Sequence, residues 1–170
     1  KIITVGFVSN RKNQINVAKA IKKLINDGYQ IKYEVVGKPQ DIKVENRLKK
    51  YNFVERTSFL DKENLIKKYR EAHIFVMPSI TETFGLTYIE AMSQGLPIIY
   101  SKEQGIDGYF ENGLVGYSVN PLNIEEIANC IIKVINNYDY FASNAFNTSS
   151  FFKWEDIIDK YVNTYESILT

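Results

Sequence analysis

The chain has 170 residues, of which 45% are hydrophobic and 24% charged, as is ordinary for a single globular domain with its own core. Lys and Arg together number 21 against 20 Asp and Glu, so the net charge of +1 gives no support to a role in nucleic-acid binding. The only cysteine, Cys130, excludes an internal disulfide and favours a reducing compartment.

The start of the chain and its apolar runs lead to further expectations. No apolar run approaches the length of a membrane span, and no signal peptide is visible. The chain starts within the strand-like run Lys1–Val5 and without a methionine, so we expect a piece cut from a longer protein. Residues 1–170 contain no internal repeat or linker and are expected to form one domain.

The first half of the chain alternates apolar, β-branched runs with amphipathic segments. In chain order we expect a strand at 2–8, a helix at 14–27, a strand at 31–36, a helix at 41–51, a strand at 53–59 and a helix at 61–72. Gly28 is a typical stop for the first of these helices, and Asp61 is a good N-cap for the third.

The second half continues the alternation, with a longer loop between the last strands. We expect a strand at 73–77, a helix at 84–94, strands at 96–100 and 115–119, a helix at 121–137 and a final amphipathic helix at 154–169. Asn120-Pro121 predicts the start of the fifth helix, because a capping amide precedes a proline at the first turn. Residues 138–150 are polar and are expected to form a loop.

This order of elements favours a doubly wound, mainly parallel, six-stranded Rossmann-like α/β sheet with helices on both faces. Ligands of such sheets bind outside the carboxyl ends of the strands. The loops that would meet a ligand are therefore expected at 9–13, 37–39, 58–60, 79–84 and 101–107.

The stretch 78–101, PSITETFGLTYIEAMSQGLPIIYS, places a glycine turn and a helix start directly after a strand. Its glutamates Glu82 and Glu90 share their spacing with other glutamate pairs of the chain, so the spacing alone says little. Their setting says more, because Glu82 precedes the helix and Glu90 lies about two turns into it. The backbone N–H groups at such a helix start favour an anion, and here they belong to Gly85, Leu86 and Thr87.

This stretch resembles the donor-binding half of the group 1, or family 4, retaining glycosyltransferases. The motif appears here as Pro78-Ser79, Glu82, Phe84-Gly85, Glu90-Ala91-Met92 and Gly95-Leu96-Pro97. Outside it, Lys12 stands where the family has a basic residue, and Gly37 matches its glycine after the second strand. The chain departs from the family at Arg11, which would replace an arginine expected near Asn10, and at Ser58, where glycine is usual.

The resemblance implies that residues 1–170 are the C-terminal, nucleotide-sugar-binding half of a two-domain GT-B enzyme whose N-terminal acceptor domain is absent. It implies that Glu82 binds the sugar hydroxyls and positions the transferred group, while Lys12 holds the diphosphate, and that both are catalytic. It implies that Glu90 takes the ribose hydroxyls. The donor contacts implied in this way come from Arg11, Phe84, Gly85, Leu86, Thr87, Glu90, Gly37 and Ser58.

The resemblance also implies the substrates and the cell context. The donor would be a UDP- or GDP-sugar, and a saccharide or glycolipid acceptor would be reached through the missing half. The chain has no Asp-x-Asp motif, so a metal-independent site without a cofactor is expected. The full-length enzyme would be bacterial and cytoplasmic, at the inner face of the membrane, and the isolated domain would be inactive.

Other interpretations of the same residues stay open. The chain could be a non-catalytic nucleotide-sugar-binding module, or half of another GT-B enzyme such as a nucleotide-sugar epimerase. Glu82 could serve only the helix dipole, and Lys12 could be a surface lysine. The single histidine, His73, cannot make a metal site and is expected to be structural, as is Cys130. A P-loop and a G-x-G-x-x-G fingerprint are both absent.

Overall fold

The computed structural model describes residues 1–169, without the side chains of residues 155, 156, 160 and 169. The strands are β1 (Ile2–Val5), β2 (Tyr33–Val36), β3 (Val54–Thr57), β4 (Ile74–Val76), β5 (Ile98–Ser101) and β6 (Gly116–Val119). The helices are α1 (Gln14–Asn26), α2 (Ile42–Leu48), α3 (Lys62–Glu71), α4 (Leu86–Ser93), α5 (Ile124–Asn136), α6 (Tyr138–Ser149) and α7 (Trp154–Leu169), with the 3₁₀ turn η1 (Ser150–Phe152) before the last.

The strands form one six-stranded sheet in the order β3-β2-β1-β4-β5-β6, and every pairing within it is parallel. The order reverses between β1 and β4, which is where ligands bind in doubly wound sheets. The predicted doubly wound α/β fold is therefore confirmed, although each strand is shorter than the pattern predicted.

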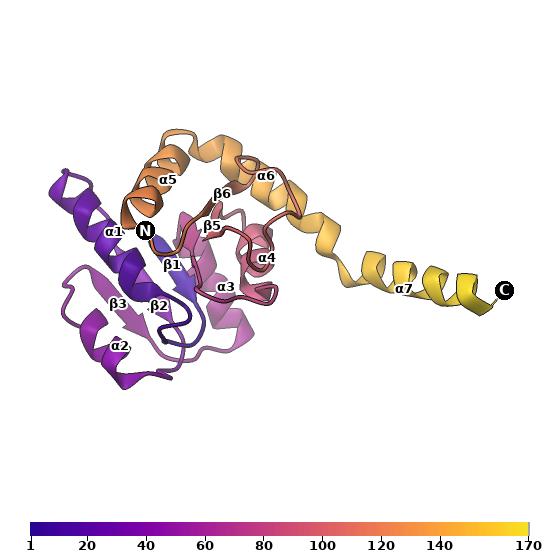
Figure 1. The fold of residues 1–170 in the computed structure, drawn as a ribbon, viewed down its shortest axis with the longest axis horizontal. Helices are drawn as coiled ribbons and strands as arrows, with labels where there is room; N and C mark the ends of the chain where they lie inside the picture. Colours follow the sequence, from indigo (N-terminus) through magenta and orange to yellow (C-terminus); the bar gives the residue numbers. More distant parts are fainter. Residues whose placement is uncertain (170) are drawn as a thin grey trace.

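The sheet is covered on both faces, and alternate strand residues enter opposite cores. Ile2 of β1 belongs to the core under α1, α2 and α5, while its neighbour Ile3 belongs to the core under α3 and α4. Helix α6 joins the two layers, because Phe141 enters the first core and Ala145 enters the second (Figure 1).

Two local predictions were wrong in the region after β6. Residues 138–149 form α6 rather than a loop, and the helix is held by Phe141 and Ala145, which are four residues apart and both buried. Helix α5 begins at Ile124 rather than at Pro121, because the side chain of Asn123 caps it by accepting from the backbone N–H of Glu126 (3.1 Å). The Asn120 side chain accepts instead from the backbone N–H of Leu122 (2.9 Å), which closes a turn before the helix.

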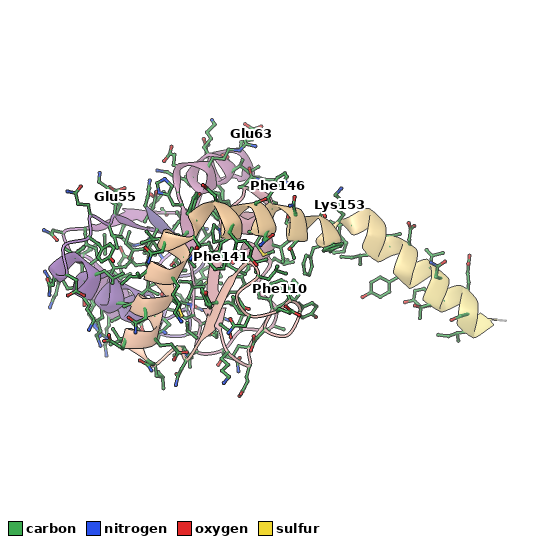
Figure 2. All side chains as sticks on the ribbon, turned by 90° about the horizontal axis from the view of Figure 1, so that it is seen from above. Glu55, Glu63, Phe110, Phe141, Phe146 and Lys153 are labelled. Atoms are coloured by element: carbon green, nitrogen blue, oxygen red, sulfur yellow. The ribbon has the colours of Figure 1, made fainter. Side chains whose placement is uncertain are left out.

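The final helix, α7, has the predicted bounds and leaves the rest of the domain after Lys153, as both views show (Figures 1 and 2). Its described apolar side chains, such as Trp154 (69% exposed) and Tyr165 (64% exposed), are largely in solvent. None of the described side chains of this helix belongs to either buried core.

The carboxyl ends of β1 and β2 approach each other unusually closely. A Cβ at Gly37, where φ is 144°, would lie 2.0 Å from the carbonyl oxygen of Gly6. Beyond these glycines, Val8 and Pro39 form an isolated parallel bridge. The glycine predicted after the second strand is thus required by the packing of two loops at the ligand-binding edge of the sheet.

Candidate functional site

The side chains of Lys12 and Glu82 meet at the carboxyl edge of the sheet. Lys12 lies in the loop after β1, and Glu82 lies in the loop between β4 and α4. Lys12 Nζ is 2.5 Å from Glu82 Oε2, and the two side chains are only 10% and 8% exposed. The structure therefore brings together the two residues expected to be catalytic, in a pair largely withdrawn from water.

The loop that carries Glu82 is held by further polar contacts. Ser79 Oγ lies 3.3 Å from Glu82 Oε2 and donates to it, and Gln104 Oε1 accepts from the backbone N–H of Glu82 at 3.1 Å. The carbonyl of Glu82 accepts from the backbone N–H of Gly105 at 3.1 Å. The loop 101–107 therefore fixes the backbone of Glu82, while Ser79 and Lys12 fix its carboxylate.

Arg11 lies at the open side of the same pair. Its Nη1 is 3.9 Å from Glu82 Oε1, donates to the carbonyl of Thr81 at 3.3 Å, and belongs to a side chain that is 46% exposed. The carbonyl of Arg11 accepts from the backbone N–H of Ile80 at 2.8 Å. The loops after β1 and β4 are thus tied together, with Arg11 positioned to reach a ligand from solvent.

The N-terminus of α4 opens beside Glu82. Gly85 is the N-cap in the left-handed conformation (φ 87°), and a Cβ there would lie 2.4 Å from the ring of Tyr88 and 3.3 Å from Glu82 Cγ. The N–H groups of Leu86 and Thr87 belong to the first helical turn, which has no intrahelical acceptors for them. Among the described residues, Thr87 Oγ1 is buried without a hydrogen-bond partner. This helix start can accept an anion next to the carboxylate.

Tyr88 packs directly against Gly85 at the start of α4. Its ring lies under Gly85, and its hydroxyl donates to the carbonyl of Met77 at the end of β4 (2.5 Å). Burial, and then the negative charge of Glu82, raise the pKa of Tyr88 well above its ordinary value, so the hydroxyl remains protonated and continues to donate. The start of α4 is therefore fastened to the strand that leads into the site.

Phe84 was expected to contact the donor, whereas in the structure its ring packs against other aromatic rings. It makes an edge contact with Tyr109 (centroids 5.3 Å apart) and a tilted contact with Phe152 (6.0 Å). The ring therefore anchors the glycine turn to the loop before β6 and to η1. A donor contact of Phe84 stays a prediction that would have to involve its backbone or its ring edge.

Glu90 has different neighbours from Glu82. It lies on the second turn of α4, is exposed, and its Oε2 accepts from the hydroxyl of Tyr69 on α3 at 3.1 Å. The two glutamates of the motif thus have separate partners. Glu82 forms an ion pair with the buried Lys12, and Glu90 accepts a hydrogen bond from the buried Tyr69.

A cavity of about 300 Å³ opens where β1, β2 and α3 meet. Its walls are mainly apolar and are formed by Val5, Gly6, Phe7, Val36, Gly37, Lys38, Phe59, Leu60 and Leu65. The cavity includes the predicted Gly37. Ser58 precedes the lining residue Phe59 and is not itself in the wall, so its contact with a ligand stays a prediction.

No motif of the sequence assigns Gln104, Tyr69 or Leu65 to this edge. The apolar pattern of 61–72 predicted only that Leu65 and Tyr69 face inward, and the strand order placed the loop 101–107, with Gln104, at the edge. Among the side chains that the structure describes, no group of three or more His, Cys, Asp or Glu is placed to hold a metal ion. Within the described part of the chain, no helix is long and apolar enough to cross a membrane.

A six-stranded parallel sheet with an anion-accepting helix start at its switch point defines a Rossmann-like domain of the kind found in GT-B glycosyltransferases. Residues 1–148 match the family described as glycosyl transferases group 1, so the chain belongs to that family. The resemblance seen in the motif is thereby confirmed.

Individual relatives agree with this assignment. A sucrose synthase of Melioribacter roseus is 29% identical over 153 residues, which are 88% of this chain and 19% of the relative. The crystal structure of sucrose-phosphate synthase from Thermosynechococcus elongatus has a TM-score of 0.84 at 25% identity, over 99% of this chain and 45% of that one. Anabaena HepE in complex with UDP has a TM-score of 0.84 at 22% identity, over 98% of this chain and 48% of that one, which is a likeness of fold. The chain therefore spans less than half the length of these proteins.

Proposed function

We propose that this chain is the donor-binding half of a retaining glycosyltransferase and that its donor is a UDP-sugar. The observation that carries the proposal is the buried Lys12–Glu82 pair beside the open N-terminus of α4, at the switch point of the sheet. Membership of the glycosyl transferases group 1 supports sugar transfer, and the UDP bound to the similarly folded HepE supports uridine over guanosine.

The donor can be laid out along the edge of the sheet by its chemistry. The apolar cavity of about 300 Å³ is suited to the base. The N–H groups of Leu86 and Thr87, together with Lys12 and Arg11, are suited to the diphosphate. Glu82 would receive the sugar hydroxyls, and Glu90 would receive those of the ribose.

The chemistry required of this half is stabilisation of the departing nucleotide. The bond between the sugar C1 and the β-phosphate oxygen breaks, and its electron pair passes to the phosphate. Lys12, Arg11 and the helix N–H groups are preorganised around that charge, an effect worth several kcal/mol, about 3–4 for one donor in a comparable site. Because positive charge from the protein stabilises the departing phosphate, the proposed reaction needs no metal ion.

Retention would follow from attack on the same face that the nucleotide leaves. The acceptor oxygen bonds to C1, and its proton passes to the departing phosphate oxygen. Glu82 positions the sugar in this scheme. The acceptor, a saccharide or glycolipid, would come from the missing half, so the isolated domain would be inactive.

The proposed setting is the cytoplasm of a bacterium, at the inner face of the membrane. The free, buried thiol of Cys130 supports a reducing compartment. Activated sugars and lipid-linked acceptors would meet at that face.

Calorimetric titration of this chain with UDP and with GDP tests the binding proposal. We expect UDP to bind with a Kd of millimolar or below and more tightly than GDP. Lys12→Ala should weaken UDP binding by about tenfold, because a charge-assisted contact to phosphate is lost. Lys19→Ala, which removes an exposed lysine of the same helix region, is the matched control and should leave the Kd unchanged. No heat with either nucleotide at millimolar concentration would rule out the proposal.

The transfer step is tested in the full-length enzyme by the anomeric configuration of its product. Release of UDP and a product with the donor's configuration support the proposal. Inversion at C1, or conversion of the UDP-sugar to its epimer without an acceptor, would contradict it.

A further inference from the structure

A buried tyrosine connects α3 to the second glutamate of the motif. Tyr69 is 1% exposed, and its hydroxyl donates to Glu90 Oε2 at 3.1 Å. Burial, and then the negative charge of Glu90, raise the pKa of Tyr69 far above its ordinary value, so the hydroxyl keeps its proton. A permanent donor therefore faces one oxygen of an otherwise exposed carboxylate.

The position of this contact matches the place where a ribose has to lie. Leu65, four residues before Tyr69 on α3, lines the apolar cavity, and residues four apart on a helix are neighbours on one face. Leu86, four residues before Glu90, lies in the first turn of α4. The Tyr69–Glu90 contact therefore lies one helical turn from a residue of the cavity wall and one helical turn from the start of α4. In a nucleotide the ribose joins the base to the diphosphate, so it occupies the space between these two sites.

We propose that Tyr69 is a positioning residue that holds Glu90 in the orientation that receives the ribose hydroxyls. The inference rests on the proposed function, because it takes the ligand to be a nucleotide. Among the described residues Tyr69 is the donor to the Glu90 carboxylate, through Oε2, so that Oε1 can accept from the ribose. No motif of the sequence marks Tyr69, and only the packing of α3 against α4 brings it to the site.

Tyr69 can hold the Glu90 carboxylate in place because its own ring is buried and packed. Its ring packs against Phe75 of β4, with the ring centroids 6.2 Å apart. An exposed glutamate on a helix samples several rotamers, and binding a ligand restricts them. Holding the carboxylate in advance removes part of that loss and thereby tightens the binding of the ribose.

The test compares UDP with 2′,3′-dideoxy-UDP, which lacks the hydroxyls that Glu90 would receive. Both ligands are titrated into this chain and into Tyr69→Phe. We expect the Kd for UDP to rise by about threefold to tenfold in the variant, as for loss of one hydrogen bond, and the Kd for the dideoxy ligand to stay within a factor of about two. An equal rise for both ligands, or no rise for UDP, would overturn the inference.

Matched variants separate positioning from general damage. Tyr33→Phe also removes a buried hydroxyl, which is bonded to Thr4 at 2.8 Å between strands β2 and β1. Arg70→Ala removes another polar contact of α3, from Arg70 Nε to Oε1 of Gln94 at the C-cap of α4 (2.8 Å). Both should keep the wild-type ratio of the two Kd values. A changed ratio in either would mean that packing of the helices, and not the Tyr69 hydroxyl, sets the preference.

Glu90→Ala distinguishes failure of this inference from failure of the proposed function. Glu90→Ala should weaken the binding of UDP and leave the binding of the dideoxy ligand unchanged. In the double variant, Tyr69→Phe should then cause no further loss of UDP affinity. If Glu90→Ala behaves so while Tyr69→Phe has no effect, the function stands and the role of Tyr69 is wrong. If Glu90→Ala does not discriminate between the ligands, the ribose assignment fails, and the role of Tyr69 fails with it.

Discussion

Lys12 and Glu82 are 70 residues apart in the chain, yet their side chains form an ion pair of 2.5 Å that is almost closed to water. The pair joins the loop after β1 to the loop after β4, across the point where the strand order reverses. In the proposed complex the lysine faces a diphosphate and the glutamate faces a sugar. Donor binding would therefore replace this ion pair by contacts with the ligand.

The first prediction concerns the stability of this pair. Lys12→Met leaves a buried carboxylate without its main partner, and Glu82→Gln leaves a buried ammonium without its counter-charge. Each should lower the free energy of unfolding by about 3–5 kcal/mol. The double variant removes both charges and should be more stable than the sum of the single effects implies. Urea denaturation of the four proteins measures this coupling; strict additivity would mean that the pair contributes nothing as a pair.

The second prediction concerns turnover in the full-length enzyme. Glu82→Gln keeps the size of the side chain but removes the charge that orients the sugar and Lys12. We expect kcat to fall by on the order of 10²-fold, as for misplacement of a reacting group, with a smaller change in KM for the donor. Initial rates at saturating acceptor measure this. Glu111→Gln, at an exposed position before β6 and outside the loop 101–107, is the control and should retain wild-type turnover; near-normal kcat in Glu82→Gln would remove Glu82 from its proposed role.

The sequence predicted the parts of this site that depend on order along the chain. Regular alternation of strands and helices predicts the parallel sheet, and a parallel sheet brings the loops bearing Lys12, Gly37 and Glu82 to one edge. That Lys12 and Glu82 share this edge followed from topology together with the motif. The direct ion pair between their side chains was not predicted.

What the sequence did not predict depends on packing between elements. In α6 the apolar residues do not fall on one face, because Phe141 and Ala145 are buried whereas Tyr140 and Phe146 are exposed, so the periodicity was too weak to reveal the helix. Pairing of Tyr69 with Glu90 depends on how α3 lies against α4, which no local pattern encodes. Proline at 121 fits a helix start, but the Asn123 cap determined where α5 begins.

The third prediction concerns the glycine at the start of α4. Gly85→Ala places a Cβ 2.4 Å from the Tyr88 ring in a left-handed conformation (φ 87°). Gly95→Ala is the matched control, because φ is 80° there and no atom lies within 4 Å of the added carbon. The control should cost about 1–2 kcal/mol from backbone strain alone, and Gly85→Ala should cost more. Chemical denaturation compares the two.

The same variants test the role of the helix start in binding. UDP affinity should fall in Gly85→Ala, since relief of the clash moves the N–H groups of Leu86 and Thr87, and should persist in Gly95→Ala. Equal stability losses and equal affinities in the two variants would show that the close packing at Gly85 has no consequence.

The fourth prediction is a pH dependence that arises away from the site, at Glu34 on β2. Burial by itself would raise the pKa of Glu34, but hydrogen bonds from Lys1, Lys68 and Thr57 outweigh it and hold the pKa below the ordinary 4.5. A carboxyl with a depressed pKa binds fewer protons in the folded state. Its stabilising contribution is therefore fully present above pH 4.5 and is lost as the pH falls through the lower, folded-state value.

Glu34→Gln should consequently be less stable than the wild type at pH 7, by about 1.5–3 kcal/mol, because hydrogen bonds to a charged group are lost. The gap should narrow as the pH falls below 4.5, because the carboxyl of the unfolded wild type then begins to bind a proton while the folded one stays ionised to lower pH. Urea midpoints measured from pH 7 to pH 3 follow both proteins. Glu111→Gln, at an exposed loop position, should track the wild type throughout. A gap between Glu34→Gln and the wild type that stays constant over this range would show that the lysine contacts do not stabilise the ionised form.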